Sequence, residues 1–422
     1  NGAKALCPAH AFRGADLLPS GTTVTAKDDL ATEGTDLVLG KPEKVEGPRG
    51  GSASRSLRTY RVAILAVAIS VIVLAAFFQG VFTVEQTVKI GVIAPLTGSS
   101  SHLADVVDGM NLAADKLNKW GGLNGAIIEL VVRDSGSDPN VSVALFEELE
   151  ENEHPLIYIS AACSCTRPLI PLAEQYQVPL MGIATANAIG FEQTDWSFRY
   201  YPGTEKETAP ALSIMESLNI TTLGIMRSDN VMGVEIAENL SVAMESSGGT
   251  AEVVDYCCKD DNITSKVDML AENQAIYIAA DFKATKVGLL AIREANYSGY
   301  VFGASPASSP EITSMPEAEG MYVSAPAIYN PNYLPAQDLK EECQQVYGHN
   351  MTHYAVSGYD AVNLIYGLMK DKELTRDVMR EQLHGGFSYA SVLGPVVVAP
   401  GSHDIQYDLL RAQVLEGRLW YL

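Results

Sequence analysis

The sequence predicts two α/β lobes, each built on a doubly wound parallel sheet, with a cleft between the lobes and a single transmembrane helix before them. Two observations predict the lobes. Short β-rich runs alternate with helical stretches from about residue 87 onward, and this series begins afresh near residue 221. Such an alternation is typical of parallel sheets covered by helices on both faces. The third observation predicts the membrane helix, because Val62–Val84 contains no charged residue.

Val62–Val84 has the length of a membrane-spanning helix. Its 23 uncharged residues exceed the roughly 20 apolar residues that cross a hydrocarbon core of about 30 Å. We therefore expect an anchor helix over residues 61–84. Residues 1–60 are rich in Gly, Ala, Ser, Thr and Pro without apolar periodicity, and they are expected to form a disordered cytosolic tail.

The charges around the predicted anchor indicate its orientation. Its N-terminal flank carries Arg49, Arg55, Arg58 and Arg61, whereas Glu85 and a lone Lys89 follow it. The positive-inside rule then leaves the N-terminus in the cytosol and the rest of the chain outside, in an extracellular or periplasmic space. A buried core helix and the apolar part of a cleavable signal are the alternatives, although the preceding segment is longer than the basic region of an ordinary signal peptide.

The two series of strands and helices follow one another along the chain. Runs rich in Val and Ile alternate with amphipathic stretches, and ligands of open parallel sheets bind beyond the carboxyl ends of such strands. In the first series we expect strands at 88–96, 126–135, 156–162 and 178–182 and helices at 104–120 and 141–152. In the second series we expect strands at 221–228, 250–256, 275–281 and 300–305 and helices at 233–246 and 284–295.

Composition narrows the class of protein. The chain has 47% hydrophobic and 19% charged residues, enough apolar material for a sizeable core. Its net charge of −22 disfavours binding to nucleic acid, because an acidic surface repels a polyanion. Six cysteines are too few for a disulfide scaffold in a chain of 422 residues, which leaves one or two disulfides or ordinary buried thiols.

Catalytic and metal motifs are absent from the sequence. There is no HExxH, GxSxG, Walker or GxGxxG pattern, so metal-assisted hydrolysis and acyl, phosphoryl and hydride transfer all lack their local signatures. His349 and His353 share helical spacing, but Gly348 and Asn350 disfavour a helix there. We therefore expect no enzyme activity, no cofactor and no metal site.

Four segments resemble one known family. The segments are IGVIAPLTGSSSHLADVVDGMNLAADKLNKWGGLNGAIIELVVRDSGSDPN, ACSCTRPLIPLAEQYQVPLMGIATAN, YIAADFKATKVGLLAIREANYSGYVFGAS and VLGPVVVAPGSHD. In this order and spacing they are similar to the leucine/isoleucine/valine-binding protein family, which has the type I periplasmic-binding fold. The resemblance covers about residues 87–422. It implies two lobes that are joined by three crossovers and close on a ligand by hinge motion.

The resemblance also implies lobe boundaries, with crossovers near residues 206, 327 and 394. Lobe 1 would comprise 87–206 and 328–394, and lobe 2 would comprise 207–327 and 395–422.

In the first lobe, the resemblance implies that hydroxyls and backbone N–H groups at strand ends and helix starts hold the carboxylate of an amino acid. Simple helix capping by the same hydroxyls is the alternative. The rim Pro95–Gly98 includes Thr97, and Leu103 occupies a position where bacterial members often carry an aromatic lid. The other candidate ligand-binding residues of this lobe are Ser164, Cys165, Thr166, Ala184, Thr185 and Ala186.

In the second lobe the sequence departs from the amino-acid-binding pattern. Met232 stands where the family often has a tyrosine, and Ser305 stands where it has an acid that pairs with the ligand amine. Because a buried ammonium without a counter-charge is costly, an amino-acid ligand needs another acid. Asp281 is the candidate, with Asp229 behind it and Phe282 at the family's aromatic wall position; a helix cap is the alternative role for Asp281.

Six Asn-x-Ser/Thr sequons lie on the side of the predicted anchor that we expect to face outward. In a eukaryotic secretory protein they would be glycosylation sites. They are Asn140, Asn219, Asn239, Asn262, Asn296 and Asn350.

These features predict a membrane-tethered extracellular receptor domain that binds a small amino-acid-like or carboxylate ligand. Its expected partners are the ligand, the membrane through Val62–Val84, and a second copy of the chain, a permease or a receptor subunit. Two alternatives remain open at this point: the solute-binding component of an ABC importer, and a domain without ligand that serves in adhesion or assembly.

Overall fold

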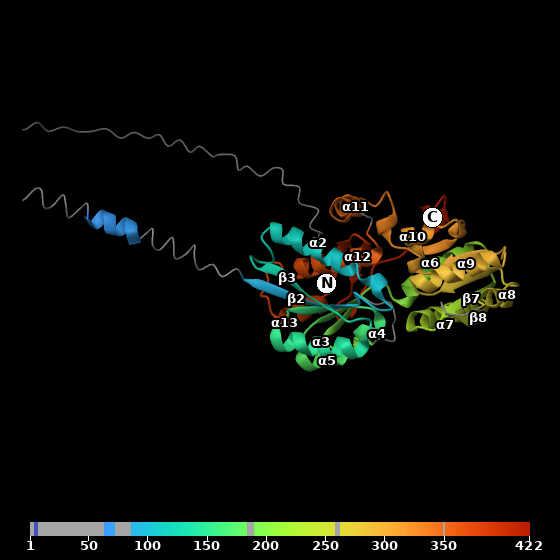
Figure 1. The fold of residues 1–422 in the computed structure, drawn as a ribbon, viewed down its shortest axis with the longest axis horizontal. Coiled ribbons are helices and arrows are strands. Elements are labelled where there is room, and N and C mark those ends of the chain that lie inside the picture. The colour runs from blue at the N-terminus through green and yellow to red at the C-terminus, as the bar shows by residue number, and fades with distance from the viewer. Residues whose placement is uncertain (1–3, 7–62, 72–85, 184–189, 258–261, 349–350) are drawn as a thin grey trace, which may run out of the picture. The chain divides into compact units, whose positions relative to one another are not determined.

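The structure is a computed structural model, and it describes residues 4–6, 63–71, 86–183, 190–257, 262–348 and 351–422. The chain divides into two compact units, and Gln86–Leu422 make up nearly all of the larger one. This unit contains a six-stranded and a seven-stranded sheet, each covered by helices, so the prediction of two α/β lobes is confirmed (Figure 1).

Lobe 1 is built on a six-stranded sheet in the order β14-β6-β5-β4-β2-β3, in which every neighbouring pair is parallel. Figure 1 shows α2 and α12 on one side of this sheet and α3 and α5 on the other. The elements before the first crossover are β2 (Thr87–Ala94), η2 (Ser101–Leu103), α2 (Val106–Lys119), β3 (Ile127–Asp134), α3 (Pro139–Asn152), β4 (Ile157–Ala161), α4 (Cys163–Thr166), η3 (Arg167–Leu169), α5 (Ile170–Tyr176), β5 (Leu180–Ile183), η5 (Phe191–Gln193) and β6 (Ser197–Tyr200).

Lobe 2 is built on a seven-stranded sheet in the order β16-β15-β11-β10-β9-β7-β8. The five strands from β11 to β8 in this order are parallel to one another, whereas β15 and β16 run antiparallel to their neighbours. The elements are α6 (Thr204–Ser217), β7 (Thr222–Ser228), α7 (Val231–Ser246), β8 (Thr250–Tyr256), α8 (Thr264–Met269), β9 (Ala275–Ala279), α9 (Phe282–Glu294), β10 (Tyr300–Gly303), η6 (Ser305–Ser308), α10 (Pro310–Thr313), η7 (Pro316–Ala318), β11 (Tyr322–Ala325), β15 (Leu410–Leu415) and β16 (Arg418–Tyr421).

The chain returns to lobe 1 between β11 and β15. A small separate sheet forms there in the order β1-β12-β13, and its β1 (Lys4–Leu6) lies within the tail that we expected to be disordered. The returning elements are η8 (Ala327–Tyr329), α11 (Leu334–Tyr347), α12 (His353–Met369), α13 (Arg376–His384), β12 (Phe387–Ser391), β13 (Gly394–Val398) and β14 (Asp404–Ile405).

Three crossovers join the lobes. The first spans the residues between β6 and α6, and the second follows β11, close to the positions expected near 206 and 327. The third lies between β14 and β15, later along the chain than residue 394. The reason is strand pairing: β13 pairs with β12 and β14 pairs with β6, so the chain stays with lobe 1 until after Ile405.

Local sequence explains the elements that support the site. Every residue of β4 is buried, because a central strand of a parallel sheet has helices on both faces. Helix α2 buries Val106, Met110 and Leu117 along one stripe. It crosses α12 closely at Gly109, where an added Cβ would lie 1.7 Å from the carbonyl oxygen of Ala355. This close packing fixes the start of α12 against lobe 1.

The predicted membrane helix lies mostly outside the described residues. Residues 63–71 are helical. Among the residues that the structure describes, no helix combines the length and apolar character required to cross a membrane. The anchor therefore stays a prediction.

Candidate functional site

A cavity of about 330 Å³ lies between the two lobes, and we call it the cleft cavity. This is within the range of small-molecule sites, roughly 300–1,000 Å³. Its walls come from the loop after β2, the start of α4, the start of α7, the start of α9 and the start of α12. The ends of parallel strands therefore meet at this cavity, as expected for open α/β sheets.

The lobe 1 wall combines a histidine, small hydroxyls and aliphatic side chains. Ser99, Ser100, His102 and Leu103 all come from the loop between β2 and α2, and Ser164 comes from α4. Helix α4 follows β4 directly, so its first N–H groups, which have no partners within the helix, lie at the cavity edge. This wall can donate hydrogen bonds to an anion.

His102 connects the two lobes. Its ring stacks with Phe282 of lobe 2 at a centroid distance of 6.3 Å and meets Tyr354 edge-on at 5.9 Å. Burial lowers the pKa of His102, because the charged imidazolium loses its hydration. Nδ1 of this ring has no hydrogen-bond partner among the described residues. At neutral pH the ring is therefore neutral, and Nδ1 is buried although the residue itself lines the cavity.

The lobe 2 wall contains one acid. Asp281 caps α9, accepting a hydrogen bond from the N–H of Ala284 at 3.0 Å. Its other oxygen, Oδ2, accepts a longer bond of 3.3 Å from the side chain of Asn230, which itself caps α7. Asp281 and Asn230 both line the cavity, together with Met232. Asp281 therefore caps α9, as the alternative reading of the sequence expected, and its Oδ2 accepts only the long hydrogen bond from Asn230.

A group of aromatic side chains lines the part of the cavity next to the crossovers. Tyr201, from the first crossover, and Tyr354, at the start of α12, both line the cavity, and their rings stack at 6.3 Å. The hydroxyl of Tyr201 hydrogen bonds to Nε2 of His353 at 2.9 Å. Burial lowers the pKa of His353 to about 3, so this ring is neutral.

Glu207 is a fully buried acid behind these tyrosines. One carboxylate oxygen accepts a hydrogen bond from the backbone N–H of Ser305. The other, Oε2, and the hydroxyl of Ser305 have no hydrogen-bond partner among the described residues. Burial raises the pKa of Glu207 to about 7, and no cation of the described residues offsets the loss of hydration. The carboxyl group therefore titrates near neutral pH.

The cleft cavity brings together four of the residues expected from the sequence: Leu103, Ser164, Met232 and Asp281. The remaining expected residues, apart from Ser305 described above, lie as follows. Phe282 contacts His102 across the lobes without lining the cavity. Ala184, Thr185 and Ala186 fall outside the described residues.

Three other expected residues do not line the cleft cavity, and their polar atoms contact neighbouring protein atoms. The hydroxyl of Thr97 donates to Asp134 at 2.7 Å. Cys165 is buried with its sulfur 3.6 Å from the hydroxyl of Ser135. Thr166 is buried and donates to the carbonyl oxygen of Ala162 at 2.9 Å. These contacts support the loops that line the cavity.

The sequons differ in accessibility. Asn140, Asn219, Asn262 and Asn296 are exposed. Asn239 is half-buried, and its side-chain oxygen accepts a hydrogen bond of 2.6 Å from Thr208. Asn350 lies outside the described residues. Glycosylation at the exposed positions stays a prediction.

Asp195, His384 and His403 form the group of described residues whose spacing suits a metal ion, with ligand atoms within 4.8 Å of one another. Two ring nitrogens already contact backbone carbonyl oxygens: Nε2 of His384 lies 2.9 Å from that of Asp195, and Nδ1 of His403 lies 2.8 Å from that of Ser197. Both rings also pack on Phe198. These contacts give both histidines a structural role at the edge of the lobe 1 sheet.

Comparison with known proteins identifies the family. The family model described as periplasmic binding protein matches residues 87–418. The chain belongs to the periplasmic binding protein family. A relative from Pseudomonas aeruginosa, named leucine-, isoleucine-, valine-, threonine-, and alanine-binding protein, is 24% identical over 264 residues, which cover 60% of this chain and 70% of the relative. An amino acid binding protein from the same organism is 31% identical over 123 residues, 29% of this chain and 31% of that protein.

Solved structures of periplasmic binding proteins share the fold. A leucine-binding protein from Thermotoga maritima has a TM-score of 0.70 at 20% identity, over 80% of this chain and 98% of that chain. A solute-binding protein of an ABC transporter from Rhodopseudomonas palustris, in complex with 3,4-dihydroxybenzoic acid, has a TM-score of 0.71 at 18% identity, over 80% of this chain and 96% of that chain. The expected resemblance is thereby confirmed.

Sequence reasoning missed several residues around the cleft of this periplasmic binding protein. His102 lies in the loop after the predicted strand 88–96, and Asn230 follows the predicted strand 221–228. Their position at a strand exit was therefore a usable signal. Tyr201, Tyr354 and Glu207 carry no such signal. They reach the site through the crossover and through helices that meet only in the folded protein.

Proposed function

We propose that the chain binds a small amino acid or a related small carboxylate in the cleft cavity and closes its two lobes about the three crossovers. One observation carries the proposal: residues of both lobes line the same cavity, and strand exits and helix starts supply its polar groups. The names of similar proteins agree with it, since one Pseudomonas aeruginosa relative is named for five amino acids and one solved structure is titled as a complex with leucine.

In this proposal lobe 1 holds the carboxylate. Ser164 offers a hydroxyl beside the first N–H groups of α4, where the helix dipole favours a negative group. The neutral ring of His102, which lines the cavity, carries one N–H group as a further donor. Leu103 and Met232 then contact the aliphatic part of the ligand from opposite lobes.

Lobe 2 holds the ammonium group of an amino-acid ligand. Asp281 lines the cavity and keeps Oδ2 only weakly bonded, so it can accept from the ligand while Oδ1 continues to cap α9. This arrangement replaces the family acid whose position is taken by Ser305. An ion pair formed in a closed cleft is stronger than one at the surface, because the local dielectric is lower.

Thermal-shift screening of the protein with leucine, alanine, threonine and 3,4-dihydroxybenzoate tests the proposal, because ligand binding stabilises the native state in proportion to occupancy. Asp281→Asn is expected to weaken amino-acid binding by about tenfold or more and to leave binding of a carboxylate without an amine unchanged. Asp229→Asn is the matched control, since Asp229 is exposed and does not line the cavity. Amino-acid affinity that is equal in both variants would disprove the role of Asp281.

A second setting for the same activity is supply of ligand to an ABC importer. The names of two similar structures favour it, because one names a branched-chain amino acid ABC transporter and the other a solute binding protein of an ABC transporter. Receptor function with the Val62–Val84 anchor remains our first proposal. Alkaline extraction of membranes separates the two: an anchored receptor stays with the membrane, whereas a soluble solute-binding subunit is released. Binding of none of the four ligands would favour the adhesion or assembly alternative.

A further inference from the structure

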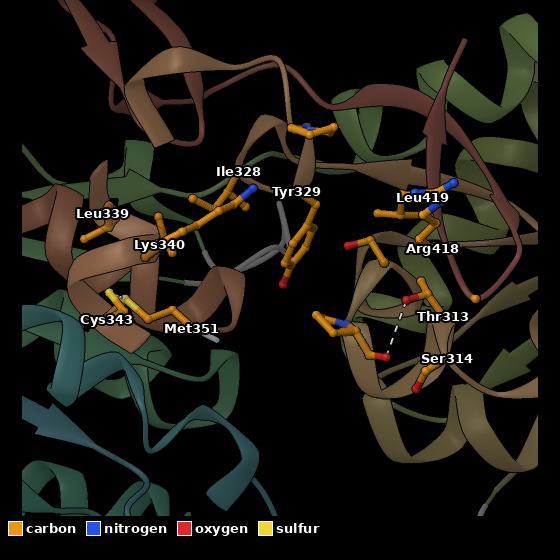
Figure 2. Close-up of a pocket in the computed structure, with 15 residues that line it drawn as sticks. Thr313, Ser314, Ile328, Tyr329, Leu339, Lys340, Cys343, Met351, Arg418 and Leu419 are labelled. Atoms are coloured by element: carbon orange, nitrogen blue, oxygen red, sulfur yellow. Dashed lines mark hydrogen bonds between the residues drawn. The ribbon is translucent and has the colours of Figure 1, made fainter. Parts of the chain in front are cut away.

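A second cavity of about 440 Å³, which we call the hinge pocket, lies against the second crossover and is lined by residues of both lobes. It shares no lining residue with the cleft cavity. Figure 2 shows Tyr329 between two walls, with Leu339 and Lys340 on one side and Thr313 and Leu419 on the other. A molecule in this pocket would contact lobe 1 through α11 and lobe 2 through α10 and β16.

Lys340 gives the pocket a positive charge in apolar surroundings. Its neighbours along the pocket wall include Ile328, Leu339 and Cys343. No hydrogen bond or ion pair joins its ammonium group to any side chain that the structure describes, whereas Lys116, which also contacts α11, pairs with Glu342 at 2.7 Å. Burial accordingly lowers the pKa of Lys340. A half-buried ammonium without a counter-charge is a binding feature for one anionic group.

The facing wall adds hydrogen-bond donors. The hydroxyls of Thr313 and Ser314 make only long bonds of 3.4 Å to backbone carbonyl oxygens of their own helical turn. The hydroxyl oxygen of Tyr329 accepts from the N–H of His353 at 2.9 Å, so its proton can be donated elsewhere. Arg418, by contrast, is engaged with Glu416 and with the ring of Trp420 at the pocket edge.

We propose that the hinge pocket is a second binding site for a small amphipathic carboxylate, whose anionic group pairs with Lys340 and whose hydrocarbon part lies against Ile328, Leu339 and Leu419. A single ammonium matches a single negative charge, which favours a carboxylate over a dianionic phosphate. The mainly aliphatic walls favour a hydrocarbon chain over a sugar.

The hinge pocket is linked to the cleft cavity by direct contacts. Tyr329, which lines the pocket, accepts a hydrogen bond from the start of α12 at His353. The ring of His353 packs on Tyr354 at a centroid distance of 3.9 Å and bonds to Tyr201 at 2.9 Å, and both tyrosines line the cleft cavity. An occupant that bridges the lobes therefore biases the hinge, and the coupling with cleft ligands is reciprocal.

Isothermal titration calorimetry of the full chain with octanoate, 1-octanol and octylammonium tests the proposal, because these probes share one hydrocarbon chain and differ in charge. Octanoate is expected to bind about tenfold more tightly than octanol, and octylammonium more weakly than both. Lys340→Met should abolish the preference for octanoate and keep octanol binding. Lys340→Arg should retain the preference, and Lys372→Met, at an exposed lysine, should behave as the wild type.

Equal affinity for octanoate and octanol in the wild type would overturn the proposal, as would an octanoate affinity that Lys340→Met leaves unchanged. If octanoate bound in the cleft cavity instead, Lys340→Met would not weaken its binding, and this outcome would also reject the hinge pocket. Folding is checked by thermal unfolding. Lys340→Met should not lower the midpoint, since it removes a desolvated charge, and Lys340→Arg keeps the test decisive if the Met variant fails to fold.

Discussion

Replacing Glu207 by Gln is expected to reduce the pH dependence of stability between pH 5 and pH 8. Glu207 is 0% exposed, and burial raises its pKa from 4.5 to about 7. One oxygen accepts a hydrogen bond from Ser305, and the other has no partner among the described residues. The carboxyl group therefore binds a proton more tightly in the folded protein than in the unfolded chain.

The sign and size follow from linkage. A raised pKa in the folded state gives a contribution that is fully present below pH 4.5 and is lost as the pH rises through about 7. The full difference corresponds to about 3 kcal/mol in the free energy of unfolding. Between pH 5 and pH 8 the wild type should lose roughly 2 to 3 kcal/mol through this group.

Urea unfolding of wild type and Glu207→Gln at several pH values between 5 and 8 measures this loss. The two proteins should have similar stability at pH 5, and the Gln variant should be the more stable at pH 8. Asp360, with a pKa raised to about 6 by burial, and His353, with a pKa lowered to about 3, also titrate, but they are common to both proteins and cancel in the difference. Glu205→Gln, at an exposed position on the same helix, should follow the wild type. Parallel pH profiles for wild type and Glu207→Gln would refute the reasoning.

Two further substitutions test the packing of lobe 1 by urea unfolding. Gly109→Ala should destabilise the protein by about 2 kcal/mol or more, because its new Cβ would lie 1.7 Å from the carbonyl oxygen of Ala355. Gly385→Ala is the control and should cost far less, because the nearest atom to its new Cβ would be at 3.2 Å. Equal losses of stability in the two variants would contradict the close crossing of α2 and α12. Arg376→Met should cost about 3 kcal/mol, because it leaves the carboxylate of Glu150, whose side chain is 6% exposed, without its two guanidinium bonds of 2.8 and 3.0 Å. The double variant with Glu150→Gln should recover most of this loss, and failure to recover would show that packing dominates.

The elements of both sheets could be predicted because their signals are local. Runs such as IYISA and AIYIA are buried on both faces, so they read as continuous apolar strands bounded by polar turns. Helix starts carried capping residues, as Asp281 does for α9. Gly348, which we took as evidence against a helix across residues 349–353, ends α11 in the left-handed conformation. The third crossover was harder, since the pairing of β14 with β6 depends on two short strands far apart in the sequence.

The site was less predictable because side-chain direction depends on tertiary contacts. Thr97 and Ser164 are both hydroxyl residues that follow a strand, yet Thr97 donates to Asp134 while Ser164 lines the cavity. The sequence does not reveal which neighbour competes for each hydroxyl. Tyr354 belongs to a helix that begins far along the chain and is brought to the cavity by the close crossing of α2 and α12. No pattern around Tyr354 itself carries that information.

Polar atoms without partners gather where the two lobes meet. Nδ1 of His102, Nδ1 of His353, Oε2 of Glu207 and the hydroxyl of Ser305 are all buried and unpaired among the described residues. Each such atom costs about 1 to 3 kcal/mol relative to a paired one. Because two of them belong to neutral imidazoles and one to a carboxyl group that titrates near neutral pH, water or a ligand that both donates and accepts can satisfy them. Of these four residues, His102 alone lines the cleft cavity, so a cleft ligand can approach only its ring, and an ordered water is the available partner for the buried atoms of His353, Glu207 and Ser305.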